Sequence, residues 1–161
     1  MTGNAMQIEI TDASFADAGI IAEFNQHLAL ESEGKRLNPE HLREGVQALL
    51  RDSHKGRYFM ACLGQEVIGQ LMHTWEWSDW RNGQIWWIQS VYVHPDHRRQ
   101  GVFRQLYDHL STLARTDEQV VGLRLYVESE NELAHATYRN MGMDPGGYFV
   151  MERFFRNQPG A

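Results

Sequence analysis

The run Gln84–Val93 is the feature that most constrains the fold, because apolar, aromatic and β-branched side chains fill it almost without interruption. Such a run is typical of a strand that is covered on both faces, whereas a half-exposed strand alternates polar and apolar residues. The segment Pro95–Gly101 is a basic, turn-forming loop, and apolar residues then recur at helical spacing. The chain is therefore predicted to pass from a central strand through a basic loop into a helix.

The remaining elements are marked by caps and breakers. Asn38 and Pro39 predict the N-cap and first position of a helix, and Gly142 predicts the end of another. The predicted order is strand, two helices, three strands, helix, strand, helix and strand. This order indicates one domain over residues 1–161 with a mixed central β-sheet flanked by helices. The strands before and after the basic loop and its helix are expected to be parallel.

Apolar strands near the end of the predicted sheet favour self-association. The first predicted strand begins at Met6, and the last covers Gly147–Phe155. We place this last strand and the run Gln84–Gln89 near the end of the sheet, and both are strongly apolar. Because an exposed apolar edge favours association with another chain, we expect a homodimer.

Composition limits the classes of partner. The 161 residues carry a net charge of -6, whereas a nucleic-acid-binding surface would be basic, so we expect no nucleic-acid partner. A mildly acidic surface suits a cationic small molecule, although it also serves solubility alone. Met1–Ile10 lacks the basic start and apolar stretch of a signal peptide. No segment approaches the roughly 20 apolar residues of a membrane span. We expect a cytoplasmic protein without a membrane partner.

The basic loop has the composition of an anion site. The first N–H groups of a helix have no intrahelical acceptor, and the helix dipole is positive there, which favours phosphate. Gly101 allows the backbone to approach a ligand, and Arg98 and Arg99 can donate charge-assisted hydrogen bonds. A solvated basic turn explains the same residues equally well. The loop lacks the Gly-Lys-Ser/Thr of a P-loop and has a single glycine, so it is not a dinucleotide fingerprint either.

Two motifs resemble those of the GNAT family of N-acetyltransferases. Ser90–Leu110 is similar to the family's acetyl-CoA-binding motif, a strand followed by Arg/Gln-x-x-Gly-x-Gly/Ala, which Arg98–Phe103 occupies here. Asn131–Met143 is similar to the family's next motif, with the same residue types in the same order. The matching positions are Asn131, Ala134, Tyr138 and Gly142. The resemblance extends from about Ile8 to Phe155 and implies the GNAT fold.

The resemblance also implies a function. It implies direct transfer of the acetyl group of acetyl-CoA, as cosubstrate, to a primary amine of a small molecule or peptide. Backbone groups at Val91 and Val93 would pair with the pantetheine arm, and Asn131 would contact that arm or position its helix. Tyr138 would donate a proton to the leaving thiolate. The pyrophosphate would be held by a segment comprising Arg98, Arg99, Gln100, Gly101, Val102, Phe103 and Arg104.

Several of these roles have simpler alternatives. Asn131 also suits a plain N-cap, and Tyr138 also suits packing through its ring. Phe103 replaces the small residue of the family motif, which leaves the detailed fit of the pyrophosphate open. A non-catalytic acyl-CoA-binding or sensing module is the alternative function. A proton donor at position 138 favours the enzyme.

The acceptor site is less defined by the sequence. Glu31 and Glu33 end the first predicted helix, where the resemblance places part of the acceptor site, and Glu76 lies among tryptophans in a later strand. Carboxylates and aromatic rings together suit a cationic, partly apolar amine. Gln89 stands where spermidine/spermine acetyltransferases have an acid, which disfavours a polyamine. His94 and His97 have no second pair at ligand spacing, so we expect no metal.

Overall fold

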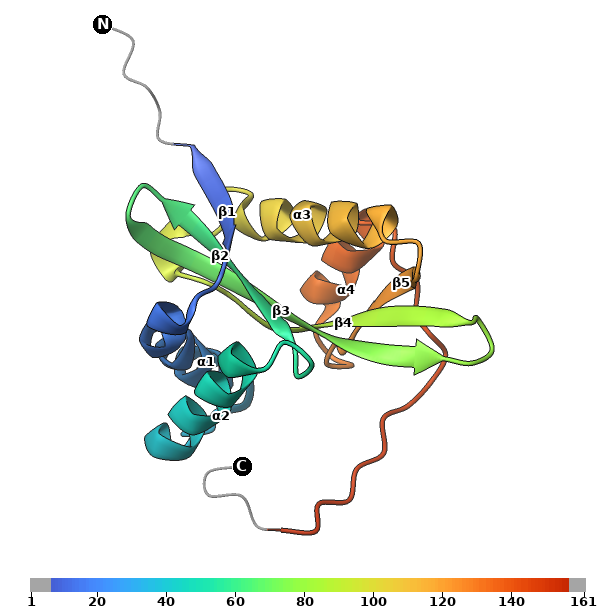
Figure 1. Ribbon diagram of the computed structural model, residues 1–161, viewed down its shortest axis with the longest axis horizontal. Coiled ribbons are helices and arrows are strands. Elements are labelled where there is room, and N and C mark those ends of the chain that lie inside the picture. Colours follow the sequence, from blue (N-terminus) through green and yellow to red (C-terminus); the bar gives the residue numbers. More distant parts are fainter. Residues whose placement is uncertain (1–6, 157–161) are drawn as a thin grey trace, which may run out of the picture.

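A twisted five-stranded sheet with helices on both faces forms the body of the protein in a computed structural model that describes residues 7–156 (Figure 1). The strands are β1 Ile8–Asp12, β2 Arg57–Leu63, β3 Glu66–Ser78, β4 Gly83–Val93 and β5 Val120–Leu125. The helices are α1 Ala18–Glu33, α2 Pro39–Arg51, α3 Val102–Thr116 and α4 Glu132–Asn140, with short 3₁₀ turns η1 Phe15–Asp17 and η2 Pro95–His97. Met6, where we predicted the first strand to begin, lies outside the described residues.

The strands follow the chain order β1-β2-β3-β4-β5 across the sheet. Neighbours are antiparallel except for β4 and β5, which are parallel and joined through α3, as predicted. Strand β4 lies between β3 and β5, so Gln84–Gln89 is one strand from the end of the sheet, as predicted, but it is not an exposed edge. The long apolar run fits the interior position because such a strand is covered on both faces.

Two apolar clusters hold the helices to opposite faces of the sheet. One cluster joins α3 to one face around Leu106 and Leu110, which are fully buried. The other joins α1 and α2 to the opposite face around Ile21 and Val46. Asn38 caps α2 as predicted, because its Oδ1 accepts a hydrogen bond from the backbone N–H of His41 at 2.9 Å. Within residues 7–156, no helix has both the length and the apolar character needed to cross a membrane.

The predicted last strand is absent from the described residues. Gly147–Phe155, which we call the C-terminal arm, is extended chain without strand pairing, and Figure 1 shows it running away from the sheet. It contains the two most exposed large apolar side chains described, Phe149 at 99% and Met151 at 94%, and Phe155 is 86% exposed. A strand requires a hydrogen-bonding neighbour, and the chain turns away from the outer edge of β5 before the arm begins. The prediction of a final strand over these residues was therefore wrong.

His73 is an ionisable group in the α3-side core. The imidazole is 1% exposed and stacks against the rings of Phe59 and Trp86, at centroid distances of 5.9 and 4.3 Å. Neither ring nitrogen has a hydrogen-bond partner among the described residues. Burial, with a smaller contribution from the charge of Arg57, lowers the pKa of His73 to about 4. The imidazole is therefore neutral in the folded protein at neutral pH.

We predict that His73 makes the protein less stable in mild acid. Between its unfolded pKa near 6.5 and its folded pKa of about 4, only the unfolded chain takes up the proton. The free energy of unfolding should therefore fall by about 1.4 kcal/mol per pH unit as pH decreases through this window. His73→Phe keeps a stacked ring and should remove this part of the slope in urea unfolding between pH 7 and 4.

Substitution of the exposed His41 by Phe is the matched control and should leave the slope unchanged. An identical pH dependence in the parent and in His73→Phe would contradict the assignment.

Candidate active site

Strand β4 loses its neighbour on one side halfway along its length. It pairs with β5 only from Gln84 to Ile88, whereas its pairing with β3 continues to Val93. Ser90 adopts a positive φ of 50° at the point of separation. Beyond it, backbone groups of β4 have no β5 partner in the described chain. Unpaired backbone groups in an extended strand are suited to bind a linear polar ligand as an added strand.

The side chains of Val91 and Val93 do not face this opening. Both pack into the α3-side core and anchor the end of β4 there. The predicted contribution of these two residues to a ligand would therefore come from their backbone, as the resemblance implied. That contribution remains a prediction.

Arg98 connects the basic loop to the end of β4 and to α1. Its Nε donates a hydrogen bond to the Val93 carbonyl oxygen at 2.9 Å, and its Nη2 lies 2.7 Å from Glu31 Oε2. The guanidinium also lies over the ring of Tyr92, 5.4 Å from its centroid. The structure thus brings together Arg98 and Glu31, which we had assigned to different ligands. Both side chains are already paired with each other.

The start of α3 carries the features of an anion site. Gly101 is the N-cap with a φ of 80°, and a Cβ built there would meet open space. The first turn contains no acidic side chain, so its N–H groups remain suited to an anion. Arg99 also has a positive φ, and no carboxylate pairs with it in the part of the chain that the structure describes.

The neighbouring residues of this segment have other contacts. Gln100 donates to the Asp96 carbonyl oxygen at 3.1 Å, and Arg104 pairs with Asp108 at 3.0 Å along the helix. Val102 is 2% exposed and packs against β3. Within residues 98–104, the Arg99 side chain and the helix N-terminus are the groups left available for an anionic ligand.

Helix α4 brings the second motif beside the first. The ring of Tyr138 meets that of Phe103 edge to face, with centroids 6.0 Å apart. The Tyr138 hydroxyl makes no hydrogen bond to any described residue, and burial raises its pKa. Asn131 is the N-cap of α4, because its Oδ1 accepts from the Ala134 N–H at 3.0 Å. Phe103 therefore fills the space between the starting turn of α3 and Tyr138.

A cavity of about 430 Å³ lies on the opposite face, between α1, α2 and β4. Ser90 lines it, so the cavity reaches the point where β4 and β5 separate. Glu33 also lines it and forms an ion pair with Lys35 at 2.7 Å. Of the three carboxylates that we assigned to an acceptor, Glu33 alone lines this cavity.

Glu76 lies at another place on the sheet. It pairs with Arg124 of β5 at 2.7 Å and accepts a hydrogen bond from the indole N–H of Trp87 at 3.0 Å. Its β4 partner in the register is Ile85, five residues before Ser90. The structure therefore does not bring Glu76 into the cavity with Glu33.

A chain of buried polar side chains connects the cavity to the strands, and it was not predicted from the sequence. Gln70, which is fully buried, donates to Asn25 Oδ1 at 2.8 Å and to the Ser90 carbonyl oxygen at 3.1 Å. Asn25 in turn donates to the Tyr58 hydroxyl at 2.9 Å, and burial raises the pKa of Tyr58. A single glutamine within the apolar run Val67–Met72 was the available signal, because buried polar side chains require partners.

Metal ligation has no structural support within the described ranges. No three His, Cys, Asp or Glu side chains gather there in a way that would hold an ion. His94 and His97 are neighbours, with ring centroids 5.9 Å apart. Cys62 is a free, half-buried thiol beside the α1–α2 core.

Comparison with known proteins points to one family. The sequence model of the acetyltransferase (GNAT) family matches residues 22–143. The crystal structure of a possible acetyltransferase from Clostridium difficile 630 superposes on this chain with a TM-score of 0.88. The two sequences are 45% identical, and the match covers 93% of this chain and 99% of the other. A predicted acetyltransferase from Clostridium acetobutylicum, solved with acetyl-CoA, is 16% identical over 91% of this chain and 96% of its own, with a TM-score of 0.73.

One curated relative carries a substrate in its name. It is a thialysine N-epsilon-acetyltransferase from Caenorhabditis elegans, which is 35% identical over 80 residues, or 50% of this chain. The matched part spans about half the length of that relative, 49%.

Proposed function

The chain belongs to the GNAT family, whose members are acetyl-CoA-dependent N-acetyltransferases, and we propose that it transfers the acetyl group of acetyl-CoA to a primary amine of a small molecule or peptide. The contact between Phe103 and Tyr138 is the observation that carries this proposal. It sets the candidate proton donor beside the candidate anion site, although the two are 35 residues apart in the chain. The open backbone of β4 ends at the same loop, through the bond from Arg98 to Val93.

The chemistry follows from these groups. The amine nitrogen attacks the thioester carbonyl carbon, and a C–N bond forms. The nitrogen loses one proton to water, the C–S bond breaks, and the sulfur leaves as a thiolate. Tyr138 would donate its proton to that sulfur, because its hydroxyl is unpaired and its raised pKa keeps it protonated at neutral pH. Unpaired N–H groups of β4 near Ser90 would stabilise the negative charge on the carbonyl oxygen.

The acceptor amine would enter from the α1–α2 side. The cavity there reaches Ser90 and is lined by the carboxylate of Glu33, which would have to exchange its partner Lys35, another lining residue, for the ammonium group of the substrate. An amine with a pKa near 10.4 is only about 0.1% neutral at pH 7.4, so the site must favour its deprotonation. The polar chain from Gln70 through Asn25 supplies hydrogen-bonding groups beside this path. An amine of the size of thialysine, on which the C. elegans relative acts according to its name, is a suitable first substrate to test.

The proposal also includes the domain organisation, the cellular location and the oligomeric state of the protein. We propose that residues 1–161 act as a single catalytic domain in the cytoplasm, as a homodimer. The exposed apolar side chains of the C-terminal arm support association, because such groups are normally covered by a partner surface.

Release of free thiol from acetyl-CoA with a panel of primary amines tests the function directly. Before turnover, acetyl-CoA should raise the melting temperature, because a ligand that binds only the folded state stabilises it by mass action. ATP at the same concentration should shift it far less, since no P-loop lysine is present. Equal shifts from both nucleotides would contradict a specific acyl-CoA site, and binding without thiol release from any amine would favour a binding module.

Gly101→Ala should separate ligand contact from backbone strain. An alanine at positive φ costs about 1–2 kcal/mol of stability, and the open space around Gly101 adds no further clash in the free protein. If pyrophosphate occupies that space, acetyl-CoA affinity measured by calorimetry should fall at least tenfold. Gly34→Ala is the matched control, since Gly34 has a φ of 64° and equally open surroundings at the end of α1. An equal loss of affinity in the two variants would remove Gly101 from the binding site.

Tyr138→Phe should lower kcat by about 10²–10⁴ while acetyl-CoA binding stays nearly intact, because general acid catalysis contributes in that range. The phenyl ring preserves the contact with Phe103. Tyr107→Phe is the matched control, because Tyr107 also lies near Phe103 and its pKa is also raised by burial.

The pH profile adds a second readout for Tyr138. Its raised pKa places the alkaline loss of activity above the pH at which an ordinary tyrosine ionises, and the variant should lack that limb. A kcat within about threefold of the parent would exclude Tyr138 as the acid.

A further inference from the structure

Strand β4 contains a β-bulge next to the point where it separates from β5. Its register against β3 shifts between Gln70 and Met72, so that Ser90 and Val91 both lie opposite Leu71. Ser90 accommodates the extra residue with its positive φ of 50°. A bulge takes a residue out of the regular ladder, and a buried backbone group left without a ladder partner must bond elsewhere.

The side-chain amide of Gln70 supplies that partner. Its Nε2 donates to the Ser90 carbonyl oxygen at 3.1 Å and to Asn25 Oδ1 at 2.8 Å. The orientation of the amide is determined by chemistry, because a carbonyl oxygen can only accept and must therefore face the nitrogen. Asn25 then presents its oxygen to Gln70 and its nitrogen to the hydroxyl of Tyr58. We call these four residues the polar chain.

Packing alone does not account for a glutamine at this position. The side chain of Gln70 is fully buried, and its Oε1 has no hydrogen-bond partner within residues 7–156. An unpaired buried oxygen lowers stability, and an apolar side chain of similar volume would avoid that cost. What the glutamine supplies, and an apolar residue would lack, is the pair of N–H groups that hold Ser90 and Asn25.

The polar chain is suited to orient groups and not to transfer protons. The side-chain amides of Gln70 and Asn25 do not ionise near neutral pH. Tyr58 is 4% exposed, and burial raises its pKa, so its hydroxyl stays protonated. The polar chain therefore contains no base for the acceptor amine, and its effect on a reaction would come through the backbone of Ser90.

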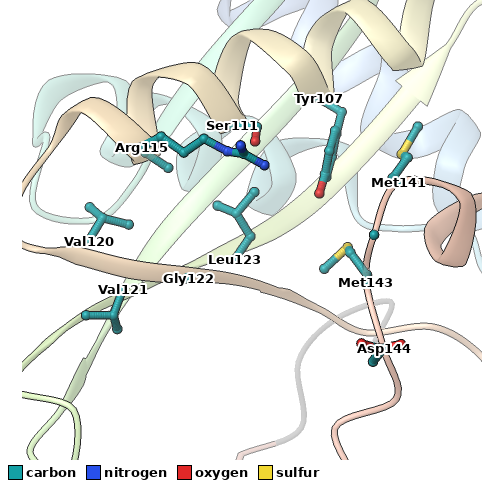
Figure 2. Close-up of a pocket in the computed structure, with 12 residues that line it drawn as sticks. Tyr107, Ser111, Arg115, Val120, Val121, Gly122, Leu123, Met141, Met143 and Asp144 are labelled. Atoms are coloured by element: carbon teal, nitrogen blue, oxygen red, sulfur yellow. The ribbon is translucent and has the colours of Figure 1, made fainter.

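The polar chain lies on one face of the sheet. Gln70 and Met72 face α1 and α2, whereas Leu71 between them packs into the α3-side core. On that other face a cavity of about 440 Å³ opens between α3 and β5, with Tyr107 and Arg115 pointing into it from α3 (Figure 2). No residue of the polar chain lines this cavity. A change at Gln70 should therefore reach β4 from the acceptor side and leave the N-terminus of α3 in place.

The bond to Ser90 also orients the next N–H group along β4. The peptide between Ser90 and Val91 is planar and trans, so its N–H points away from its carbonyl oxygen. With that oxygen held toward Gln70 on β3, the Val91 N–H is turned to the side of β4 that β5 no longer covers. A fixed N–H group at that place is suited to stabilise the oxyanion of the proposed reaction.

We propose that Gln70 is a positioning residue for acetyl transfer: its side-chain amide holds the Ser90 carbonyl, and so keeps the Val91 N–H directed at the thioester oxygen. Asn25 fixes the amide from α1, the helix that also lines the acceptor cavity. The effect on turnover rests on the proposed function. The effect of Gln70 on the conformation of Ser90 does not, and it can be measured without any substrate.

Gln70→Met tests the effect on turnover, because it removes both donors and keeps an unbranched side chain of similar length. The kcat at saturating substrates should fall about tenfold or more, since one oxyanion donor contributes ~10²–10³. The Kd of acetyl-CoA, measured by calorimetry, should stay within about threefold of the parent. Gln84→Met is the matched control, because Gln84 is a half-buried glutamine at the far end of β4, and it should keep the parent kcat.

A purely structural role for Gln70 predicts a different result. Gln70→Met would then melt at a lower temperature while its kcat stayed within about threefold of the parent, and that outcome would overturn the proposal. If Gln70→Met does not fold, Asn25→Ala replaces it, because Asn25 is only half-buried. Loss of the bond from Gln70 to Asn25 should lower kcat in the same direction, and an unchanged kcat in Asn25→Ala would also count against the proposal.

The NMR chemical shifts of the Ser90 backbone report its φ independently of turnover. They should have left-handed values in the parent and in Gln84→Met, and should move toward extended values in Gln70→Met. A positive φ that persists in Gln70→Met would refute the positioning role. If the shifts change as expected but the parent releases no thiol with any amine, Gln70 still fixes the bulge and the proposed acetyl transfer alone is refuted.

Discussion

The unequal pairing of β4 is the constraint on which the rest of the structure depends. On the β3 side its backbone is bonded along nearly its whole length, which fixes the strand in space. On the β5 side the bonding stops at Ile88, because β5 ends there in the register and Ser90 breaks the regular conformation. A strand held firmly on one side can leave polar backbone groups open on the other without unfolding. The candidate anion site, the candidate proton donor and the candidate acceptor cavity are all arranged around that opening.

In the proposed reaction, the two faces of the sheet would bind different substrates. The face covered by α3 and α4 carries the helix N-terminus and Tyr138, which are suited to a phosphorylated thioester. The face covered by α1 and α2 carries the cavity with Glu33, which is suited to an amine. Ser90 belongs to the strand between them. Direct transfer between the substrates then requires no carrier residue, and the half-buried Cys62 on β2 is in the wrong place to be one.

The sequence was most informative where local chemistry decides the structure. The cap at Asn38, the crossover through α3 and the two motifs around Gly101 and Tyr138 depend on short-range signals, and the fold agrees with them. Side-chain partners across the sheet were not readable, because they depend on register. The pairing of Arg98 with Glu31, the position of Glu76 beside Arg124 and the chain from Gln70 to Asn25 are of this kind. The apolar pattern of the C-terminal arm predicted a last strand, but the arm is extended chain without strand pairing, because the pattern alone does not supply a hydrogen-bonding neighbour.

The packing at Gly69 sets the position of the candidate anion site, although Gly69 is not part of that site. A Cβ at this position of β3 would lie 3.1 Å from Val102 and from the carbonyl oxygen of Tyr92, which is closer than packed atoms ordinarily allow. The missing side chain lets the first turn of α3 rest directly on the sheet. Even a methyl group there would displace the helix by a few tenths of an ångström and change the distance between its N-terminus and the end of β4. Substitutions at Gly69 would therefore change the candidate anion site from the opposite side of α3, even though Gly69 is not among the residues proposed to bind the ligand.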